Sequence, residues 1–472
     1  MKFSNHTIIV NDYPAAGEHL VYHTRTQALI KIKEELKNLI ENFPSPFPSL
    51  PQSVLKNLEA LHRTGILVKD EEEDRQRLLA HLDQIKYGRM KSRLVLTVLT
   101  TYACNLKCVY CFEESTRSRT EQMEPSTAER LIVWLKNKIN EEKYGELFLV
   151  FYGGEPLANR PAIDRIAAAM QAWCREQGVR FQFMLQTNGY LLSAEAVDHY
   201  VALGLTQARI SIDGVGEKHD RTRPLRGGGG TFERIMRNIE ANIDKIRISL
   251  SVGFDKGETA HIEELIGFLK QRGILHKLGN FIFGAIHATL GPAGNTERIV
   301  SPQCMCNYEN DNLTAAYRKI HALLEENGLP VRDGLSTSIC PVTRDHGAGT
   351  VDQHGRIYKC NSMLGHPELS TGNIFDEPKN AKHKEFVGLD VWKQCPQDCT
   401  YMPMCGGGCR LSSFLINKNF STPTCHKPYL NRMAPDFIKR EYQKKLAERT
   451  SKTAKTGAVN NLLNKEAIYS NL

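Results

Sequence analysis

Between residues 94 and 286 the chain alternates strand-like and helix-like stretches, and this alternation limits the fold more than any other feature. The strand-like runs are LVLTVLT at 94–100, LFLVFY at 147–152, FQFML at 181–185, ARISI at 208–212, IRISLSVGF at 246–254 and NFIFGAI at 280–286. Helical apolar spacing fills the intervals, as at 128–139 and at 163–174, where Cys174 is expected in the core. Six such units predict an α/β fold, a partial (β/α)6 barrel of the TIM type.

A cysteine array follows the first of these strands. The run TYACNLKCVYCF places Cys104, Cys108 and Cys111 in a C-x3-C-x2-C pattern. A 4Fe-4S cluster takes one cysteine per iron, so three cysteines leave one iron open to a ligand that is not protein. A zinc site is the alternative, although zinc pairs usually need a second pair to close a tetrahedron. Barrel enzymes carry their chemistry on loops after the strands, where this array falls.

The amino-terminal residues, 1–88, are expected to form a separate small module. Strand character occurs at 8–10 and 19–23, and apolar residues at helical spacing predict a helix over 26–40. A second helix near 54–62 precedes the segment RTGILVKDEEED, which is typical of a short strand and an acidic helix start. This order predicts a winged-helix-like unit.

Cysteines multiply after residue 300 while the regular alternation fades. They are Cys304, Cys306, Cys340, Cys360, Cys395, Cys399, Cys405, Cys409 and Cys425. Short cysteine-rich loops bury little apolar surface, so metal or clusters are expected to hold this region together. A helix at 435–447 and a polar tail follow. The predicted domains are 1–88, 89–300, 301–430 and 431–472.

Composition excludes several classes of function. No apolar run among the 472 residues approaches the roughly 18 to 20 needed for a membrane span, and no signal-peptide core is present at the amino terminus. The thirteen cysteines crowd into motifs, which fits reduced cytoplasm better than a secreted disulfide framework. Much of the net charge of +8 comes from residues 439–455, so we expect a solvated tail and no nucleic-acid partner.

With these motifs the chain resembles the radical S-adenosylmethionine superfamily, in its SPASM subgroup, over roughly residues 94–426. The resemblance implies that the cysteine array holds a 4Fe-4S cluster whose open iron binds S-adenosylmethionine. It also implies cofactor contacts from residues of the motifs VYCF, GGE, QTNG, SIDG and HDRTR, namely Tyr110, Gly153, Gly154, Glu155, Asn188, Ser211 and Arg223. A turn residue or a surface ion pair is the alternative for the last three. His219 is expected to be structural.

The distal cysteines give the subgroup, because Cys340, fourteen residues, Gly355, four residues and Cys360 match its opening. The resemblance implies two auxiliary 4Fe-4S clusters, three in all, the first held by Cys340, Cys360 and Cys409, and the second by Cys395, Cys399, Cys405 and Cys425. The first set needs a fourth ligand, Cys304 or Cys306, or leaves an iron open. The spacing from Cys395 to Cys399 exceeds the family's by one residue, and zinc stays an alternative at these sites.

Members of this subgroup modify peptides or proteins. The branch that makes formylglycine in sulfatases carries an aspartate base after the second SPASM cysteine, where this chain has Asn361, and a glutamine where it has Tyr152. An amide cannot take up a proton as a carboxylate does. The resemblance therefore favours the branch that modifies ribosomally made precursor peptides, in which a winged-helix-like domain captures the leader as an added strand. A module that only packs on the barrel is the alternative.

The function predicted from the sequence is a radical peptide maturase. It would abstract a Cα or Cβ hydrogen with a 5'-deoxyadenosyl radical and form a thioether, while an auxiliary cluster accepts the substrate's electron. Formylglycine formation, other crosslinks and epimerisation are alternatives within the family, and an electron-transfer or zinc-binding module is the alternative outside enzymes. The expected partners are a precursor peptide with its leader and a reductant such as flavodoxin or ferredoxin.

Overall fold

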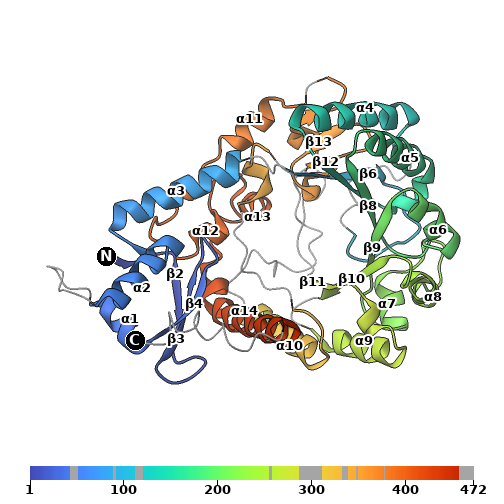
Figure 1. Cartoon of the computed structure of the whole chain (residues 1–472). Coiled ribbons are helices and arrows are strands. Elements are labelled where there is room, and N and C mark those ends of the chain that lie inside the picture. Colours follow the sequence, from blue (N-terminus) through green and yellow to red (C-terminus); the bar gives the residue numbers. More distant parts are fainter. Residues whose placement is uncertain are drawn as a thin grey trace.

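The computed structural model describes residues 1–42, 51–88, 92–111, 121–254, 258–285, 311–331, 339–346, 349–376 and 378–456. Its centre is a nine-stranded sheet of order β11-β10-β9-β8-β7-β6-β12-β13-β14 (Figure 1). Six parallel strands lie in it in chain order: β6 (Arg93–Thr101), β7 (Glu146–Gly153), β8 (Arg180–Thr187), β9 (Leu205–Ser211), β10 (Arg247–Phe254) and β11 (Phe281–Ala285). The predicted partial barrel is confirmed.

Helices cover the outer face of these strands, as Figure 1 shows. The helices between the parallel strands are α4 (Pro125–Glu142), α5 (Arg160–Glu176), α6 (Ala194–Ala202), α7 (Glu217–Thr222), α8 (Phe232–Asn242) and α9 (Ala260–Gln271). In α5 the buried side chains Ile163, Ile166, Met170 and Cys174 recur at helical spacing and pack in the main core. The burial of Cys174 in the core is thus confirmed.

The cysteine-rich region continues the barrel sheet. Strand β12 (Gly349–Val351) pairs in parallel with β6, and β13 (Arg356–Tyr358) and β14 (Gly372–Asn373) then pair antiparallel. The short helices of this region are η4 (Pro341–Thr343), η5 (Asn361–Met363), η6 (Pro367–Leu369), α11 (Ala381–Val387), η7 (Val391–Gln394), α12 (Met402–Cys405) and α13 (Arg410–Asn417). The predicted domain boundary at residue 300 lies outside the described residues.

The amino-terminal unit has more sheet than predicted. Its strands β2 (Thr7–Val10), β3 (Glu18–His23) and β4 (Leu29–Lys33) form an antiparallel sheet, while β1 (Lys2–Phe3) pairs with β5 (Leu67–Val68). Its helices are α1 (Glu34–Glu41), α2 (Gln52–Thr64) and α3 (Glu71–Tyr87). The helix and short strand predicted after residue 54 are confirmed.

The helix predicted over 26–40 is wrong in its first half, where β4 forms. Leu29 packs toward α14, whereas Ile30 and Ile32 pack toward α1 and α2, so neighbouring side chains point to opposite faces. Pairing with β3 decides this short apolar run, whose spacing suits both a helix and a strand.

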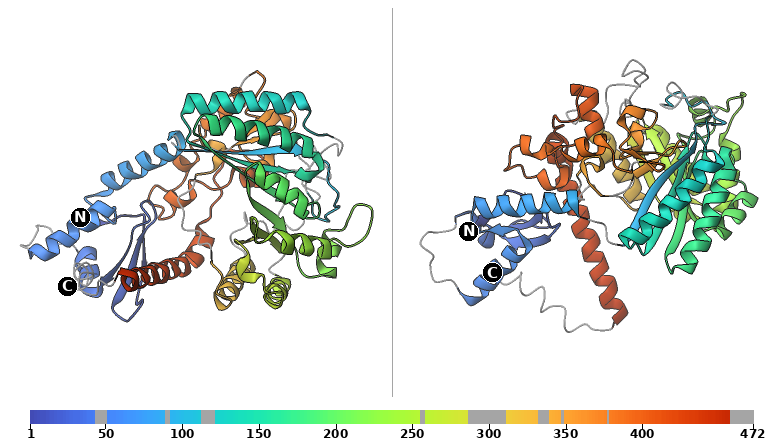
Figure 2. Two further views of the ribbon diagram at one scale, coloured as in Figure 1. Left: turned by 45° about the vertical axis from the view of Figure 1, so that its right-hand side comes forward. Right: turned by 90° about the horizontal axis from the view of Figure 1, so that it is seen from above.

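The carboxyl-terminal helix α14 (Lys427–Thr456) begins ahead of the predicted 435–447. Its apolar residues, Met433, Phe437 and Ile438 among them, pack on the face of β3 that carries Leu20 and Tyr22. It also contacts α10 (Asp311–Glu326), and Figure 2 shows it running beside the amino-terminal sheet. The sheet is therefore covered on both faces. Among the described helices, none is both long and apolar enough to cross a bilayer.

Candidate functional site

The cysteine loop lies at the carboxyl end of β6 and is pinned to the segment that follows α7. The amide of Lys107 donates to the carbonyl of Pro224 in that segment at 2.8 Å, and the amide of Val109 donates to the carbonyl of Thr222, the last residue of α7, at 3.0 Å. The guanidinium of Arg226 donates to the carbonyls of Cys104 at 3.2 Å and Leu106 at 3.1 Å. A stretch distant in sequence therefore sets the shape of the loop. Sequence reasoning missed Arg226, whose signal was a third arginine in RTRPLR.

Gly153 and Gly154 let β7 approach the start of this loop. A Cβ atom on Gly153, which has a φ of +146°, would lie 2.2 Å from the carbonyl oxygen of Thr101. A Cβ on Gly154 would lie 2.4 Å from that of Tyr102. The amide of Gly154 donates to Thr101 at 2.9 Å. Glycine is required at both positions because backbone meets backbone here.

Glu155 is fully buried and ties the ends of β7 and β8 together. Its carboxylate accepts hydrogen bonds from the Thr187 hydroxyl at 2.7 Å and from the amides of Asn188 at 2.8 Å and Leu157 at 3.2 Å. Burial raises the pKa of this carboxyl, while the three donors oppose the shift. A direct contact between Glu155 and the cofactor stays a prediction.

Asn188 brings the end of β8 to the first cysteine. Its Nδ2 donates to Asn105 Oδ1 at 2.9 Å and lies 3.8 Å from the sulfur of Cys104. Its Oδ1 accepts from the amide of Tyr190 at 2.9 Å, which holds the side chain in place. Ser211, the last residue of β9, is half-buried. Its contact with a cofactor stays a prediction.

Tyr110, Asp213 and Arg223 form a buried network beside the cysteines. Arg223 Nη1 donates to the Tyr110 hydroxyl at 2.5 Å, and that hydroxyl donates to Asp213. The Arg223 guanidinium lies 3.6 Å from the Asp213 carboxylate, whose other oxygen accepts from Gly253 at 3.1 Å. Burial raises the pKa of Tyr110, so it stays a neutral donor. Sequence reasoning missed Asp213, although it is the aspartate of SIDG.

His219 has a structural position behind this network. Its Nδ1 accepts from the amide of Asp213 at 3.2 Å, and the ring packs near Phe232. Burial lowers the pKa of His219 to about 4, so the ring is neutral near neutral pH. This agrees with the structural role predicted for it.

The donor set of the cysteine loop fits a cluster with a chelated ligand. Burial raises the pKa of the Cys104 thiol to about 12, and the nearby Glu155, Cys108 and Cys111 add to the shift. None of the described cysteines is in a disulfide. Arg223 Nε is buried and makes no hydrogen bond within the described residues, so it is available to a carboxylate.

No three Cys, His, Asp or Glu side chains in the described ranges converge on a single metal ion. A 4Fe-4S cluster places each thiolate on a different iron. Its ligands therefore stand farther apart than the four around one zinc ion. Cys108 and Cys111 add to the raised pKa of the Cys104 thiol, so the three thiols lie within electrostatic reach of one another.

The distal cysteines lie in the two groups that the sequence predicted, although their metal-binding role stays a prediction. Cys340, Cys360 and Cys409, the first distal group, share an apolar cluster with Leu99 and Tyr102 at the end of β6. Burial raises the pKa of Cys340 to about 11, and the other two thiols add to the shift. The first distal group therefore borders the cysteine loop.

The second distal group consists of Cys395, Cys399, Cys405 and Cys425. Burial raises the pKa of Cys405 to about 11, with Cys395 and Cys399 adding to the shift, and Cys425 acts on Cys395. The predicted extra ligands of the first group, Cys304 and Cys306, lie outside the described residues.

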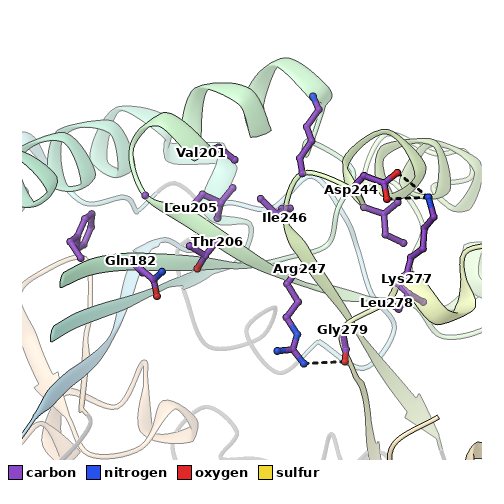
Figure 3. Close-up of a pocket in the computed structure, with 14 residues that line it drawn as sticks. Gln182, Val201, Leu205, Thr206, Asp244, Ile246, Arg247, Lys277, Leu278 and Gly279 are labelled. Atoms are coloured by element: carbon purple, nitrogen blue, oxygen red, sulfur yellow. Dashed lines mark hydrogen bonds and ion pairs between the residues drawn. The ribbon is translucent and has the colours of Figure 1, made fainter. Parts of the chain in front are cut away.

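A hollow of about 810 Å³ lies at the other end of the strands, and its lining is shown in Figure 3. Its charged side chains are already engaged: Lys277 pairs with Asp244 at 2.9 Å, and Arg247 donates to the carbonyl of Gly279 at 3.2 Å. Since barrel chemistry belongs to the carboxyl ends of the strands, the hollow is not a candidate active site.

Comparison with known proteins agrees with this geometry. Residues 98–269 match the model of the radical SAM superfamily. The serine-type anaerobic sulfatase-maturating enzyme of Bacteroides thetaiotaomicron is 22% identical over 374 residues, covering 72% of this chain and 89% of that protein. The Fe-coproporphyrin III synthase of Methanosarcina barkeri is 27% identical over 202 residues, 43% of this chain. The chain spans less than half the length of that synthase and of a related haem synthase, 46% and 38%.

Solved structures share the fold. The sulfatase-maturating enzyme anSMEcpe with bound AdoMet superposes with a TM-score of 0.58 and 20% identity, covering 73% of this chain and 98% of its own. SuiB of Streptococcus suis, bound to precursor peptide SuiA, superposes with a TM-score of 0.53 and 13% identity, covering 90% of this chain and 98% of its own. The family match and the cysteine loop at the end of β6 show that residues 98–269 form a radical SAM domain, and the solved structures share its fold.

Proposed function

We propose that this chain is a radical S-adenosylmethionine peptide maturase. One observation carries the proposal. At the carboxyl ends of the parallel strands, three cysteine thiols lie near Asn188 and near Arg223, whose buried Nε has no hydrogen-bond partner within the described residues. A 4Fe-4S cluster bound there supplies the electron that cleaves S-adenosylmethionine to methionine and a 5'-deoxyadenosyl radical.

The residues around the thiols orient the cofactor. Asp213 and Tyr110 hold the Arg223 guanidinium in place, so its Nε can donate to the cofactor carboxylate without a further desolvation step. Carbonyl oxygens near Gly153 and Gly154 are the acceptors suited to the cofactor ammonium. Glu155 acts through its hold on Thr187 and Asn188 and is a positioning residue in this proposal.

The two distal groups are proposed to hold auxiliary clusters. Abstraction of a hydrogen atom from the peptide leaves a carbon radical and 5'-deoxyadenosine. When a cysteine sulfur bonds to that carbon, the thiol loses a proton and one electron leaves the peptide. The first distal group borders the cysteine loop through Leu99 and Tyr102, so it is the nearer acceptor for that electron. A reducing protein such as flavodoxin or ferredoxin would supply the electron that starts each turnover.

The amino-terminal unit supports a peptide substrate. Its three-stranded sheet has β2 and β4 at the edges, and a leader peptide can extend an edge by main-chain hydrogen bonds. SuiB, whose structure is described as bound to precursor peptide SuiA, covers more of this chain than anSMEcpe does, 90% against 73%. The proposed substrate is therefore a precursor peptide, with thioether formation as the preferred reaction.

Formylglycine formation is the second candidate, favoured by the match to sulfatase-maturating enzymes over 72% of the chain. Against it stands Asn361, at the position of the expected base. Its Oδ1 accepts a hydrogen bond from the Thr350 hydroxyl on β12, so the amide helps to hold the Asn361 segment against that strand. An amide oxygen held in this way does not take up a substrate proton.

Anaerobic reconstitution with iron and sulfide, followed by incubation with S-adenosylmethionine and dithionite, tests the proposal. We expect about twelve irons per chain, the content of three 4Fe-4S clusters, and formation of 5'-deoxyadenosine. Replacement of Cys104, Cys108 and Cys111 by Ala should abolish the nucleoside. Zinc in place of iron, or nucleoside made by the triple variant, would overturn it.

Mass spectrometry of a synthetic peptide that contains cysteine and serine separates the reactions. Thioether formation removes two hydrogens and consumes the thiol, whereas oxidation of serine to formylglycine removes two hydrogens and leaves the thiol free to alkylate. Formylglycine from cysteine also exchanges sulfur for oxygen, and either aldehyde is identified by its reaction with a hydrazide. Cys360→Ala and Cys405→Ala should retain some cofactor cleavage and make no modified peptide, because the substrate electron then has no acceptor.

A further inference from the structure

The segment of the second distal group that carries Cys395 and Cys399 packs against the amino-terminal unit, although hundreds of residues separate the two in sequence. Thr24, which follows β3, is fully buried, and its hydroxyl lies 2.8 Å from the carbonyl oxygen of Thr400. His6, also buried, places Nδ1 3.1 Å from the carbonyl oxygen of Cys399. A carbonyl oxygen only accepts, so both side chains donate to the backbone at this cysteine.

Apolar contacts complete the enclosure on two further sides. On the sheet face, Leu20 and Tyr22 of β3 pack in one cluster with Tyr401 and Met404. From α3, Leu78 and Leu82 pack in another with Trp392 and Met402, against which Cys395 and Cys399 lie. Figure 1 shows α12 between the amino-terminal sheet and the rest of the cysteine-rich region.

An ion pair ends this contact at the last turn of α3. Lys86 is buried and its Nζ lies 2.5 Å from a carboxylate oxygen of Asp390, and 5.0 Å from the ring centre of Trp392. Asp390 directly precedes the helix η7 that leads to Cys395. The segment from Asp390 to Cys405 therefore takes its shape from polar, apolar and ionic contacts with the amino-terminal unit.

We infer that Thr24 and His6 are positioning residues of the second distal group, so that the unit proposed to bind the leader also builds an auxiliary metal site. The segment between Cys395 and Cys405 contains turns whose backbone hydrogen bonds are local, Cys399 to Pro396, Met402 to Cys399, and Met404 and Cys405 to Tyr401. Donors from His6 and Thr24 fix the carbonyls of Cys399 and of the residue after it, and thereby the backbone that carries the Cys399 thiol. The inference rests on the proposed function insofar as that group holds metal.

Thr24→Val tests the inference, because valine keeps the shape of threonine and removes the hydroxyl. After anaerobic reconstitution we expect the iron content to fall from about twelve to about eight per chain, or iron release to a chelator from one cluster to become about tenfold faster. The electron paramagnetic resonance signal of that cluster should change with it. Thr24→Ser keeps the donor and should restore the wild-type values.

Thr26→Val is a matched control two residues away. Its hydroxyl donates to the carbonyl of Thr64 at 2.7 Å, inside the amino-terminal unit, so its loss should leave the iron content unchanged. Circular dichroism of all variants verifies folding. Wild-type iron content and release rate in Thr24→Val would overturn the inference, and so would equal losses in Thr24→Ser and Thr26→Val. A wild-type chain with only about four irons would instead overturn the proposed auxiliary clusters.

Discussion

The cysteine loop after β6 and the second distal group are held in place by different means. The loop sits on a strand end, and neighbouring parallel strands supply its supports: Gly154 from β7, Asn188 after β8 and Asp213 after β9. The second distal group lies among turns and short helices, and a separate unit near the amino terminus supplies its supports.

The two kinds of support predict different effects of substitution at the two sites. Around the cysteine loop the supports follow neighbouring strands of one continuous sheet, and one of them, Asp213, is a buried charge, so a change there acts on the barrel itself. Around the second distal group the supports cross an interface between two units. We expect disturbance there to loosen the metal site before it unfolds the barrel.

Asp213→Asn should give the largest effect, because it removes the carboxylate that faces the buried Arg223. An uncompensated buried charge typically costs about 3–5 kcal/mol. Urea unfolding should show this loss, and S-adenosylmethionine binding measured by calorimetry should weaken, while distal metal stays bound. Asp164→Asn is the control, since its pair with His199 is exposed and worth less than about 1 kcal/mol. Equal effects of the two variants would remove the distinction drawn between the sites.

Glu155→Gln should follow in size. The glutamine amide has one acceptor oxygen where the carboxylate accepts from three donors, so at least one buried donor loses its partner. We expect a loss of about 2–3 kcal/mol in the free energy of unfolding. Glu146→Gln is a matched control at the amino end of β7, the strand that leads to Glu155. The arginine partners of Glu146 are more exposed than the donors to Glu155. A smaller loss at Glu155 than at Glu146 would contradict the assignment.

Asp390→Asn should cost less, about 2 kcal/mol, because Asp390 is half-exposed although Lys86 is buried. The effect should fall on metal retention at the second distal group, with S-adenosylmethionine binding preserved. Lys86→Met in the same chain removes the stranded charge and should restore most of the lost stability. Failure of this double variant to recover would show that the ion pair does not hold the interface.

Much of the barrel site follows from sequence for a physical reason. A parallel strand is a continuous apolar run, and the residues after it must lie at one edge of the sheet, so Cys104, Gly153, Asn188 and Ser211 could be placed together. Arg226 and Asp213 were missed because their roles depend on contacts with a loop distant in sequence.

The amino-terminal unit shows the limit of local patterns. At 29–33 the apolar spacing fits a helix and a strand alike, and only pairing with β3 decides between them. The contacts of His6 and Thr24 with the segment of Cys399 join positions that no spacing relates. The grouping of the distal cysteines was predicted from family resemblance. The residues that surround them could be named only from the folded structure.

The smallest expected effect is the part of the pH dependence that His23 of the amino-terminal unit contributes, beside other buried histidines such as His219 of the barrel. His23 is fully buried, and its Nδ1 lies 2.8 Å from the Thr26 hydroxyl. Burial, with nearby Arg25, lowers the pKa of His23 from 6.5 to about 3. The unfolded chain then binds more protons than the folded chain below pH 6.5, so stability falls as the pH falls toward 3. Between pH 7 and pH 5.5 we expect a loss of about 1 kcal/mol in unfolding experiments. His23→Gln should flatten this slope, whereas the same change at exposed His199 should not. A slope unaltered by His23→Gln would mean that other groups cause the pH dependence and that His23 does not contribute to it.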